Sequence, residues 1–346
     1  MWKDKKFIGR SIAGCMALGL LALTPVPGQA AEKLDVFTAS TGFLYVTAYI
    51  AKQMGYFSDA GLDVTISDVG GGSNAVAALV GGSAQIGDVG LKNMSKPVER
   101  GISLKAIGTG INGFPNALVV RDDWAKKAAL PATATLQQRM AMLKNATVAV
   151  QDVGGSSGGF VRYLLAEAGL PNNFVTVINM ESNAGQLASL KARRIDAFVN
   201  TSPIWERAVT DGYGVDLVLP SRDMESLKGM AYIIQAVPEA FLKSHRETVK
   251  KYLIGIRRAQ LLAQREPEKA KHAFRDYLAS LTTAEATPDN VMDVMWAKSA
   301  DSIPKDLVLQ PEAIKEARAF FKIGPELTDA QLIDNSLARE VMASVK

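Results

Sequence analysis

The chain has 346 residues, of which 48% are hydrophobic and 21% are charged. This composition excludes a disordered chain, a collagen-like fibre and a small disulfide-stapled domain, and it is that of a folded globular protein. The formal net charge of +4 is too low to indicate nucleic-acid binding by itself. The length suits either one large domain or two lobes.

The first thirty residues have the three parts of a secretory signal peptide. A basic start at 3–10 precedes an apolar run, Ile12–Thr24, and small residues before Ala31 predict cleavage after Ala30. The apolar run is shorter than the roughly 20 residues that span a bilayer. A lipoprotein signal at Cys15 is the alternative, but the apolar stretch continues past that cysteine.

Removal of residues 1–30 takes away four basic residues, one acidic residue and the single cysteine, and it leaves 35 basic and 34 acidic residues. A mature chain without cysteine has no disulfide, no thiol nucleophile and no thiolate metal site. These features predict an exported protein of a bacterial periplasm.

Short strand-like segments alternate with helical segments from Leu34 onward. The predicted strands are 34–38, 63–69, 85–89, 104–109 and 116–120, and the predicted helices are 44–54 and 73–80. This alternation predicts an α/β fold with a mostly parallel sheet and helices on both faces.

The alternation restarts after a polar segment at 130–138. The predicted strands of this second unit are 147–151, 174–178 and 195–199, and its helices are 160–168 and 184–192. Because both units run in the same order, we expect two related lobes. A last strand is predicted at 231–236, as a return of the chain to the first lobe. The helices predicted after it are 247–264, 267–279, 288–297, 311–321 and 329–345.

One glycine-rich turn, Gly70–Ala75, matches the dinucleotide-binding pattern G-x-G-x-x-A, with Asp88 in the place of the ribose-binding acid. The turn follows the second predicted strand rather than the first, and its helix is only about two turns long. The pattern is therefore weak evidence for a nicotinamide cofactor. A P-loop is excluded, because no Gly-Lys-Ser/Thr follows this turn or the next one.

A second turn, Gly154–Gly159, matches G-x-S-x-G with either Ser156 or Ser157 at its centre, between a strand and a helix. This is the setting of a hydrolase nucleophile. Such a serine needs a neighbouring base, normally histidine. The only histidines, His245 and His272, lie in charged helical stretches, which argues against this reading without removing it.

A third turn, Ser40–Phe43, follows the first strand, and all three turns share one physical property. A helix N-terminus presents unpaired N–H groups and a partial positive charge, and glycine lets an oxyanion approach them. Helix capping explains any one turn more simply. Three such turns, distributed over two lobes, favour a common site between the lobes.

Part of the chain, about 34–270, resembles the periplasmic solute-binding proteins of the nitrate/sulfonate/taurine type, which serve ABC importers. The matching segments are Ala51–Phe57, Gly61–Val64, Gly71–Ser73 with Ala77–Leu79, Ile86-Gly87, and Leu190 with Ile195–Ala197. The resemblance implies the two-lobed type II periplasmic-binding-protein fold, with mixed sheets flanked by helices and a ligand cleft at the hinge. The lobes would be 31–120 plus 225–346, and 121–224.

The resemblance further implies a non-catalytic, monomeric protein that captures a small anionic solute and passes it to an ABC permease in the inner membrane. It implies no cofactor, metal or nucleic acid. Since the predicted loops hold no lysine or arginine, a sulfonate, nitrate, a carboxylate and a neutral heterocycle all stay open. The alternative is a secreted α/β serine hydrolase with Ser156 or Ser157 as nucleophile. The residues implied to bind the solute are Ser40, Thr41, Gly42, Phe43, Gly72, Ser73, Asn74, Phe114, Gly155, Ser156, Ser157, Asn200 and Trp205.

Overall fold

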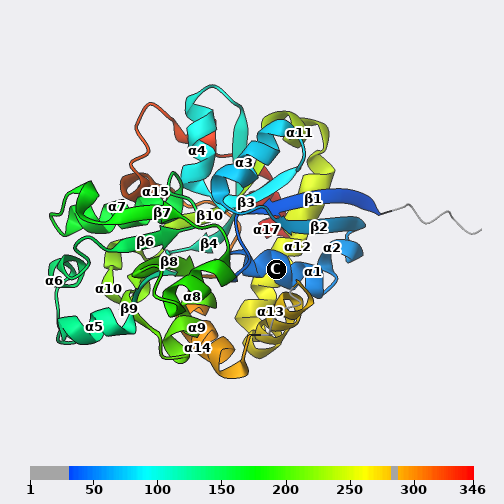
Figure 1. Cartoon of the computed structure of the whole chain (residues 1–346). Coiled ribbons are helices and arrows are strands. Elements are labelled where there is room, and N and C mark those ends of the chain that lie inside the picture. The colour runs from blue at the N-terminus through cyan, green and yellow to red at the C-terminus, as the bar shows by residue number, and fades with distance from the viewer. Residues whose placement is uncertain (1–30, 282–286) are drawn as a thin grey trace, which may run out of the picture. The chain divides into compact units, whose positions relative to one another are not determined.

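The computed structural model describes residues 31–281 and 287–346. The predicted signal peptide, its cleavage after Ala30 and the alternative at Cys15 lie outside these residues. Residues 31–346 form one unit that contains two separate sheets (Figure 1). Within the described part of the chain, every helix is too short or too polar to cross a membrane.

The first sheet has five strands in the order β2-β1-β3-β10-β4. Its strands are β1 (Glu32–Thr38), β2 (Leu62–Asp68), β3 (Ile86–Gly90), β4 (Leu104–Asn112) and β10 (Ala231–Pro238). Strand β1 pairs in parallel with β2 and β3, whereas β10 runs antiparallel between β3 and β4. The strand at 231–236 therefore does return to the first sheet, and it inserts into the middle.

The second sheet has the order β7-β6-β8-β5-β9. Its strands are β5 (Asn116–Arg121), β6 (Thr147–Val150), β7 (Thr176–Asn179), β8 (Ala197–Thr201) and β9 (Gly214–Val218). Strand β6 is parallel to β7 and β8, and β5 is antiparallel to β8 and β9. Each sheet is thus mixed. In the first sheet β10 is antiparallel to both of its neighbours, and in the second sheet β5 is antiparallel to both of its neighbours.

Strand β5 belongs to the second sheet, although it precedes residue 121, where the second lobe was predicted to begin. The β-branched residues of β5 predicted a strand, but they did not predict that it pairs with β8 and β9. The division of the chain into lobes stays a prediction. A first crossing between Asn112 and Asn116, and a second between Val218 and Ala231, suit the strand pairing better.

Helices cover both sheets (Figure 1). Those up to β10 are α1 (Val46–Gln53), α2 (Tyr56–Asp59), α3 (Gly72–Gly81), α4 (Leu91–Glu99), α5 (Asp122–Ala128), α6 (Leu136–Ala141), α7 (Ser156–Glu167), α8 (Asn183–Lys191), α9 (Ile204–Thr210) and α10 (Pro220–Asp223). A short 3₁₀ turn, Phe43–Tyr45, leads into α1. Helices α2, α4, α5, α6, α9 and α10 and strand β9 were not predicted.

The C-terminal part is helical, as predicted. Its helices are α11 (Glu239–Ser244), α12 (Arg246–Arg265), α13 (Pro267–Leu281), α14 (Asp289–Ser299), α15 (Pro311–Phe321), α16 (Asp329–Leu332) and α17 (Ser336–Ser344). The single helix predicted at 329–345 is wrong. The chain is extended at Ile333, which bridges to Ala106 of β4, and the N–H of Asp334 donates to the carbonyl of Ala106.

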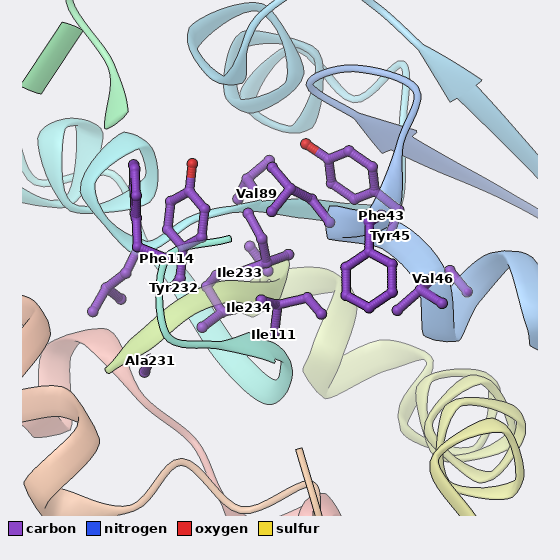
Figure 2. Packing of buried hydrophobic residues seen from close by; sticks show 14 of the residues in the cluster. Phe43, Tyr45, Val46, Val89, Ile111, Phe114, Ala231, Tyr232, Ile233 and Ile234 are labelled. Atoms are coloured by element: carbon purple, nitrogen blue, oxygen red, sulfur yellow. The ribbon is translucent and has the colours of Figure 1, made fainter. Parts of the chain in front are cut away.

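The core beside the first sheet fixes the direction of the first turn. The ring of Phe43 packs edge-on against Phe274 of α13 and Trp296 of α14, at centroid distances of 5.8 and 6.1 Å. Figure 2 shows that Tyr45 points the other way, with its hydroxyl on the same side as that of Tyr232 from β10. The chain around Phe43 therefore anchors one side chain in the core and presents the next aromatic residue to the opposite side.

Candidate functional site

Two of the three turns singled out in the sequence reach one small hollow, and the third turn lies beside it. The turn at Gly70–Ala75 contributes Gly71 and Gly72, and the turn at Gly154–Gly159 contributes Ser156 and Ser157. The residues that flank the Ser40–Phe43 turn contribute Ala39 and Tyr45. The remaining lining residues are Leu44, Gly90, Asn93, Asn116, Gln151, Asp152, Tyr232 and Ile233. Its volume is about 30 Å³, which is room for about two water molecules. Residues from both sheets line it, so its size depends on how closely the two sheets approach.

Three helices start at this hollow. Helix α3 begins at Gly72, α4 at Leu91 directly after Gly90, and α7 at Ser156. In each case the residues at the helix start line the hollow, so the partial positive charge of three N-termini lies at its wall.

The carboxylate of Asp152, which follows β6, reaches across to the start of α3. Its Oδ2 accepts hydrogen bonds from the N–H of Ser73 at 3.1 Å, from the Ser73 hydroxyl at 2.6 Å and from Nδ2 of Asn93 at 3.2 Å. Its Oδ1 accepts from the N–H of Gly154 at 2.9 Å. A carboxylate of the chain itself therefore occupies the N-terminus of α3, with the charge-assisted hydrogen bonds that such a site favours.

Further polar contacts surround this carboxylate. The hydroxyl of Ser156 donates to Oδ1 of Asn93 at 3.1 Å, and Nζ of Lys96 donates to the carbonyl oxygen of Gly154. We call the set formed by Ser73, Asn93 and Lys96 with Asp152, Gly154 and Ser156 the seam. It joins helices beside the first sheet to the turn that begins α7 beside the second.

Glycine is required at the seam because the two sides approach closely. A Cβ atom at Gly90 would lie 2.5 Å from Oγ of Ser156, and one at Gly155 would lie 2.5 Å from Oδ2 of Asp152. At Gly72 it would lie 2.6 Å from Cγ of Asn93. Real Cβ atoms do not come so near other atoms. The contact of Gly90 with Ser156 crosses the seam, so a side chain at Gly90 would separate the two sides.

Two tyrosines supply the hydroxyl groups of the hollow. Tyr45 accepts a hydrogen bond from the N–H of Ala39 at 3.2 Å. Burial raises the pKa of Tyr45 and of Tyr232 well above the usual value for tyrosine. Both therefore stay neutral over the physiological range and keep a proton that they can donate.

The charge and hydrogen-bond inventory of the hollow is unusual. Asp152 is the one charged side chain among its lining residues, which include no lysine, arginine or histidine. Asn116, which opens β5, is 1% exposed, and its Oδ1 has no hydrogen-bond partner among the described residues.

Several of the predicted binding residues come together here. Gly72, Ser156 and Ser157 line the hollow, while Ser73 and Gly155 lie against Asp152. Others contact its surroundings. Thr41 donates to Asp68, Asn74 donates to the carbonyls of Val69 and Gly70, and Ser40 is buried with an unpartnered hydroxyl. At Gly42 a Cβ would lie 2.8 Å from the carbonyl oxygen of Ser202, which explains the glycine.

Ten of the thirteen predicted binding residues do not line this hollow, and four of these ten lie in the core or are held by other side chains. Phe43 is buried against α13 and α14, and Asn200 is held by Asn183 and Gln186. Trp205 is 1% exposed and donates its indole N–H to Ser202 in the core beside the second sheet. Phe114 packs against Tyr232 but does not reach the hollow. The proposed apolar walls are therefore core residues in this structure.

Phe114 instead borders a larger hollow of about 570 Å³ where the crossings between the sheets run. None of the three turns reaches it. Three lysines line it: Lys228, which pairs with Glu225, Lys298, which lies 5.0 Å from the ring centroid of Trp205, and Lys305. The smaller hollow is the candidate site, because there the helix starts and the polar side chains coincide.

Six polar residues of the candidate site were not predicted: Tyr45, Asn93, Asn116, Gln151, Asp152 and Tyr232. A signal existed for two of them, because Gln151 and Asp152 directly follow a predicted strand and precede the Gly154 turn. Asn93 was missed with α4, and Tyr232 and Asn116 lie on strands whose pairing local sequence does not reveal.

The hydrolase alternative lacks support in this geometry. Ser156 donates to Asn93, and Ser157 donates to the carbonyl oxygen of Asp152 at 3.1 Å. His245 follows α11 and stacks on Phe241, and His272 lies on α13 beside Asp289 and Asp293. Neither histidine lines the hollow.

The dinucleotide alternative and a metal site also find no support. Asp88 is 1% exposed and accepts a hydrogen bond from Tyr252 of α12, and burial raises its pKa to about 7. It faces the core rather than the turn at Gly70. Over residues 31–281 and 287–346, no cluster of three or more His, Cys, Asp and Glu residues is placed to hold a metal ion.

Comparison with known proteins gives the family and the fold. The model of the NMT1-like family matches residues 39–280. None of the curated proteins compared with the chain matches it. Among solved structures, a protein from Bordetella bronchiseptica RB50 has a TM-score of 0.77 at 23% identity, covering 90% of this chain and 98% of that one.

Two further structures have stated ligands. The periplasmic nitrate-binding protein NrtA from Synechocystis PCC 6803 has a TM-score of 0.69 at 16% identity and covers 91% of this chain and 89% of its own. The alkanesulfonate-binding protein SsuA from Xanthomonas axonopodis pv. citri, bound to MOPS, has a TM-score of 0.66 at 17% identity, with 90% and 99% covered. The predicted two-lobed fold is confirmed, and the chain belongs to the NMT1-like family.

Proposed function

We propose that this protein is the solute-binding component of an ABC importer. It captures a small solute that carries an oxyanion, such as a sulfonate, nitrate or a carboxylate, and delivers it to a permease in the inner membrane. Residues 1–30 direct it to the periplasm, where it acts as a monomer. The family, the shared fold, and the stated ligands of NrtA and SsuA support this proposal.

The observation that carries the proposal is the hollow at which α3, α4 and α7 begin. Oriented N–H groups and the hydroxyls of Tyr45 and Tyr232 are donors for an oxyanion that needs no side-chain cation. Because both sheets contribute residues, a bound solute contacts both sides at once and favours their approach. Closure of this kind reports occupancy to a permease.

The protein acts by binding rather than by catalysis in this proposal. Ser156 and Ser157, the only nucleophile candidates of the sequence motif, are hydrogen-bonded to Asn93 and to Asp152. Neither is paired with a general base, which nucleophilic catalysis by serine requires.

Thermal unfolding of the exported protein, measured with sulfonates, nitrate, carboxylates and pyrimidines, tests the proposal. A ligand that binds only the folded state at a hundred times its Kd stabilises it by about 2.7 kcal/mol, which is readily measured as a rise in Tm. Tyr232→Phe should weaken that rise, while Tyr213→Phe, at a half-buried position outside the lining residues, should not. Folded protein that no member of the panel stabilises would contradict the proposed function.

A further inference from the structure

We infer that Asn116 and Asp152 select a solute that donates a hydrogen bond, so that the hollow takes a molecule with an N–H or O–H group beside its oxyanion. This inference rests on the proposed function and narrows its solute class. It assigns to two residues outside the predicted set the role of distinguishing donor-bearing solutes from oxyanions that can only accept.

Asn116 is the first part of the argument. It lines the hollow, it is 1% exposed, and its Oδ1 has no hydrogen-bond partner among the described residues. A buried carbonyl oxygen without a donor costs free energy, and native proteins rarely leave one unpaired. The backbone of Asn116 is fixed at the start of β5 opposite Thr201 of β8. The solute is therefore well placed to supply the missing donor.

Asp152 is the second part. Its Oδ2 already accepts three hydrogen bonds, from two groups of Ser73 and from Asn93, whereas its Oδ1 accepts one, from Gly154. A carboxylate has about four lone-pair sites, so Oδ1 keeps capacity for a further donor. A group that can only accept hydrogen bonds is repelled at this oxygen, whereas an N–H or O–H group gains a hydrogen bond there.

The donors of the hollow complete the arrangement. The hydroxyl oxygen of Tyr45 accepts a hydrogen bond from the N–H of Ala39, so the hydroxyl proton of Tyr45 points away from Ala39. The helix starts at Leu91 and Ser156 face the same space. Donors and acceptors therefore coexist around one small volume. Nitrate, which has no proton, would satisfy only the donors. It would leave Asn116 unpaired and could place only acceptor oxygens against Oδ1 of Asp152.

Matched ligand pairs that differ in one donor test this inference on the full exported protein. The pairs are 2-aminoethanesulfonate with ethanesulfonate and 4-aminobenzoate with benzoate, and nitrate serves as the proton-free oxyanion. Calorimetric titration gives each Kd. We expect the amino member of every pair that binds to bind at least about tenfold more tightly, and nitrate to bind worse than any amino member.

Asn116→Leu removes the acceptor while it keeps a similar volume, and it should bring the affinity ratio within each binding pair close to one. Asn112→Leu is the matched control, because Asn112 lies at the end of β4 outside the hollow, where it accepts a hydrogen bond from Thr109, and its loss should leave the ratio unchanged. If Asn116→Leu fails to fold, the wild-type ratios and the identity of any solute that co-purifies, read by native mass spectrometry, decide the question.

The outcomes separate the two proposals. Binding in which the donor-free member is equal or tighter, or a co-purified solute without any N–H or O–H group, overturns this inference and leaves the proposed function standing. Absence of binding by every member, with no co-purified solute, overturns the proposed function and the inference with it.

Discussion

Two junctions connect the parts of the chain that carry the two sheets, and they are built from opposite chemistry. The seam at Asp152 consists of hydrogen bonds, glycines and a partly exposed carboxylate. The other junction is aromatic: Phe114 lies between Phe160 of α7 and Tyr232 of β10, with centroid distances of 4.6 and 4.5 Å, and Phe320 of α15 lies 5.4 Å away.

The difference shows how one junction can open while the other holds. Hydrogen bonds at a partly exposed surface are exchanged for bonds to water at little net cost. Apolar rings in contact lose burial and packing when they separate. We therefore expect the seam to separate reversibly and the aromatic junction to persist. Of the four predictions below, given in order of decreasing effect, three test this contrast.

Phe114→Ala should have the largest effect. The ring is 3% exposed and contacts three other aromatic side chains, and truncation of a buried phenylalanine costs about 3–5 kcal/mol. Denaturant unfolding measures the loss. Phe241→Ala, at a half-buried ring that stacks only on His245, is the control and should cost clearly less. Equal losses would mean that the aromatic junction carries no special share of stability.

Glu206 of α9, outside both junctions, gives the stability of the fold a dependence on pH. Its side chain is 1% exposed and accepts a hydrogen bond from Ser202, which contacts Ser299 at the end of α14. Burial raises the pKa of Glu206 from 4.5 to about 8. Between these values the unfolded chain loses the proton that the folded chain keeps, so stability should fall as pH rises, by at most about 1.4 kcal/mol per pH unit.

Glu206→Gln removes this titration. Subtracting its unfolding free energy from that of the wild type at each pH cancels the contribution of Asp88, whose raised pKa acts in the same direction. The difference should decline from pH 4.5 to about 8 and then level off. Parallel curves for the two proteins would show that Glu206 does not titrate in this way.

Asp152→Asn should loosen the seam. The amide of asparagine has only one acceptor oxygen. It therefore either turns its NH₂ group towards the N–H of Ser73 or loses the hydrogen bond from the N–H of Gly154. Either loss costs about 1–3 kcal/mol. Small-angle scattering of the ligand-free protein should give a larger radius of gyration for this variant. Asp211→Asn, on an exposed ion pair with Arg207, is the matched control. Identical scattering of all three proteins would remove the seam from any role in closure.

Gly90→Ala should have the smallest effect, of about 1 kcal/mol on the approach of the two sides. The new methyl group would lie 2.5 Å from Oγ of Ser156. In a Ser156→Ala background the obstacle is smaller, so the two substitutions should be non-additive. Gly81→Ala, at the end of α3 with nothing within 4 Å, should leave closure unchanged. Additive effects would place the cost outside the contact with Ser156.

The sequence revealed local structure better than long-range pairing. Strands such as 34–38 and 63–69 were readable because buried β-branched runs are local signals. Helix α4 had a signal too, with Leu91, Met94 and Val98 buried along one side, but its polar residues and Pro97 concealed it. The pairing of β5 with β8 and the insertion of β10 depend on residues far apart in the sequence, which no local pattern encodes.

The same limit applies to the candidate site. Two of the three predicted glycine turns, Gly70–Ala75 and Gly154–Gly159, reach the hollow, whereas the third helix start there belongs to α4, which was not predicted. The binding role of these turns stays a prediction. Their glycines, however, have a cause that spacing could not reveal, namely the close approach of Asn93, Asp152 and Ser156. Aromatic residues such as Trp205 were assigned to the cleft by type alone, and type does not distinguish a wall from a core.

The position of β10 has a consequence for how the chain folds. Strands β3 and β4 lie on either side of β10. Neither can pair with β10 until residues 231–238 have been synthesised. Contacts over such sequence distances make folding slow. An N-terminal half that cannot complete its sheet stays in a loose state for longer, and a loose chain is what the export proposed for this protein would require.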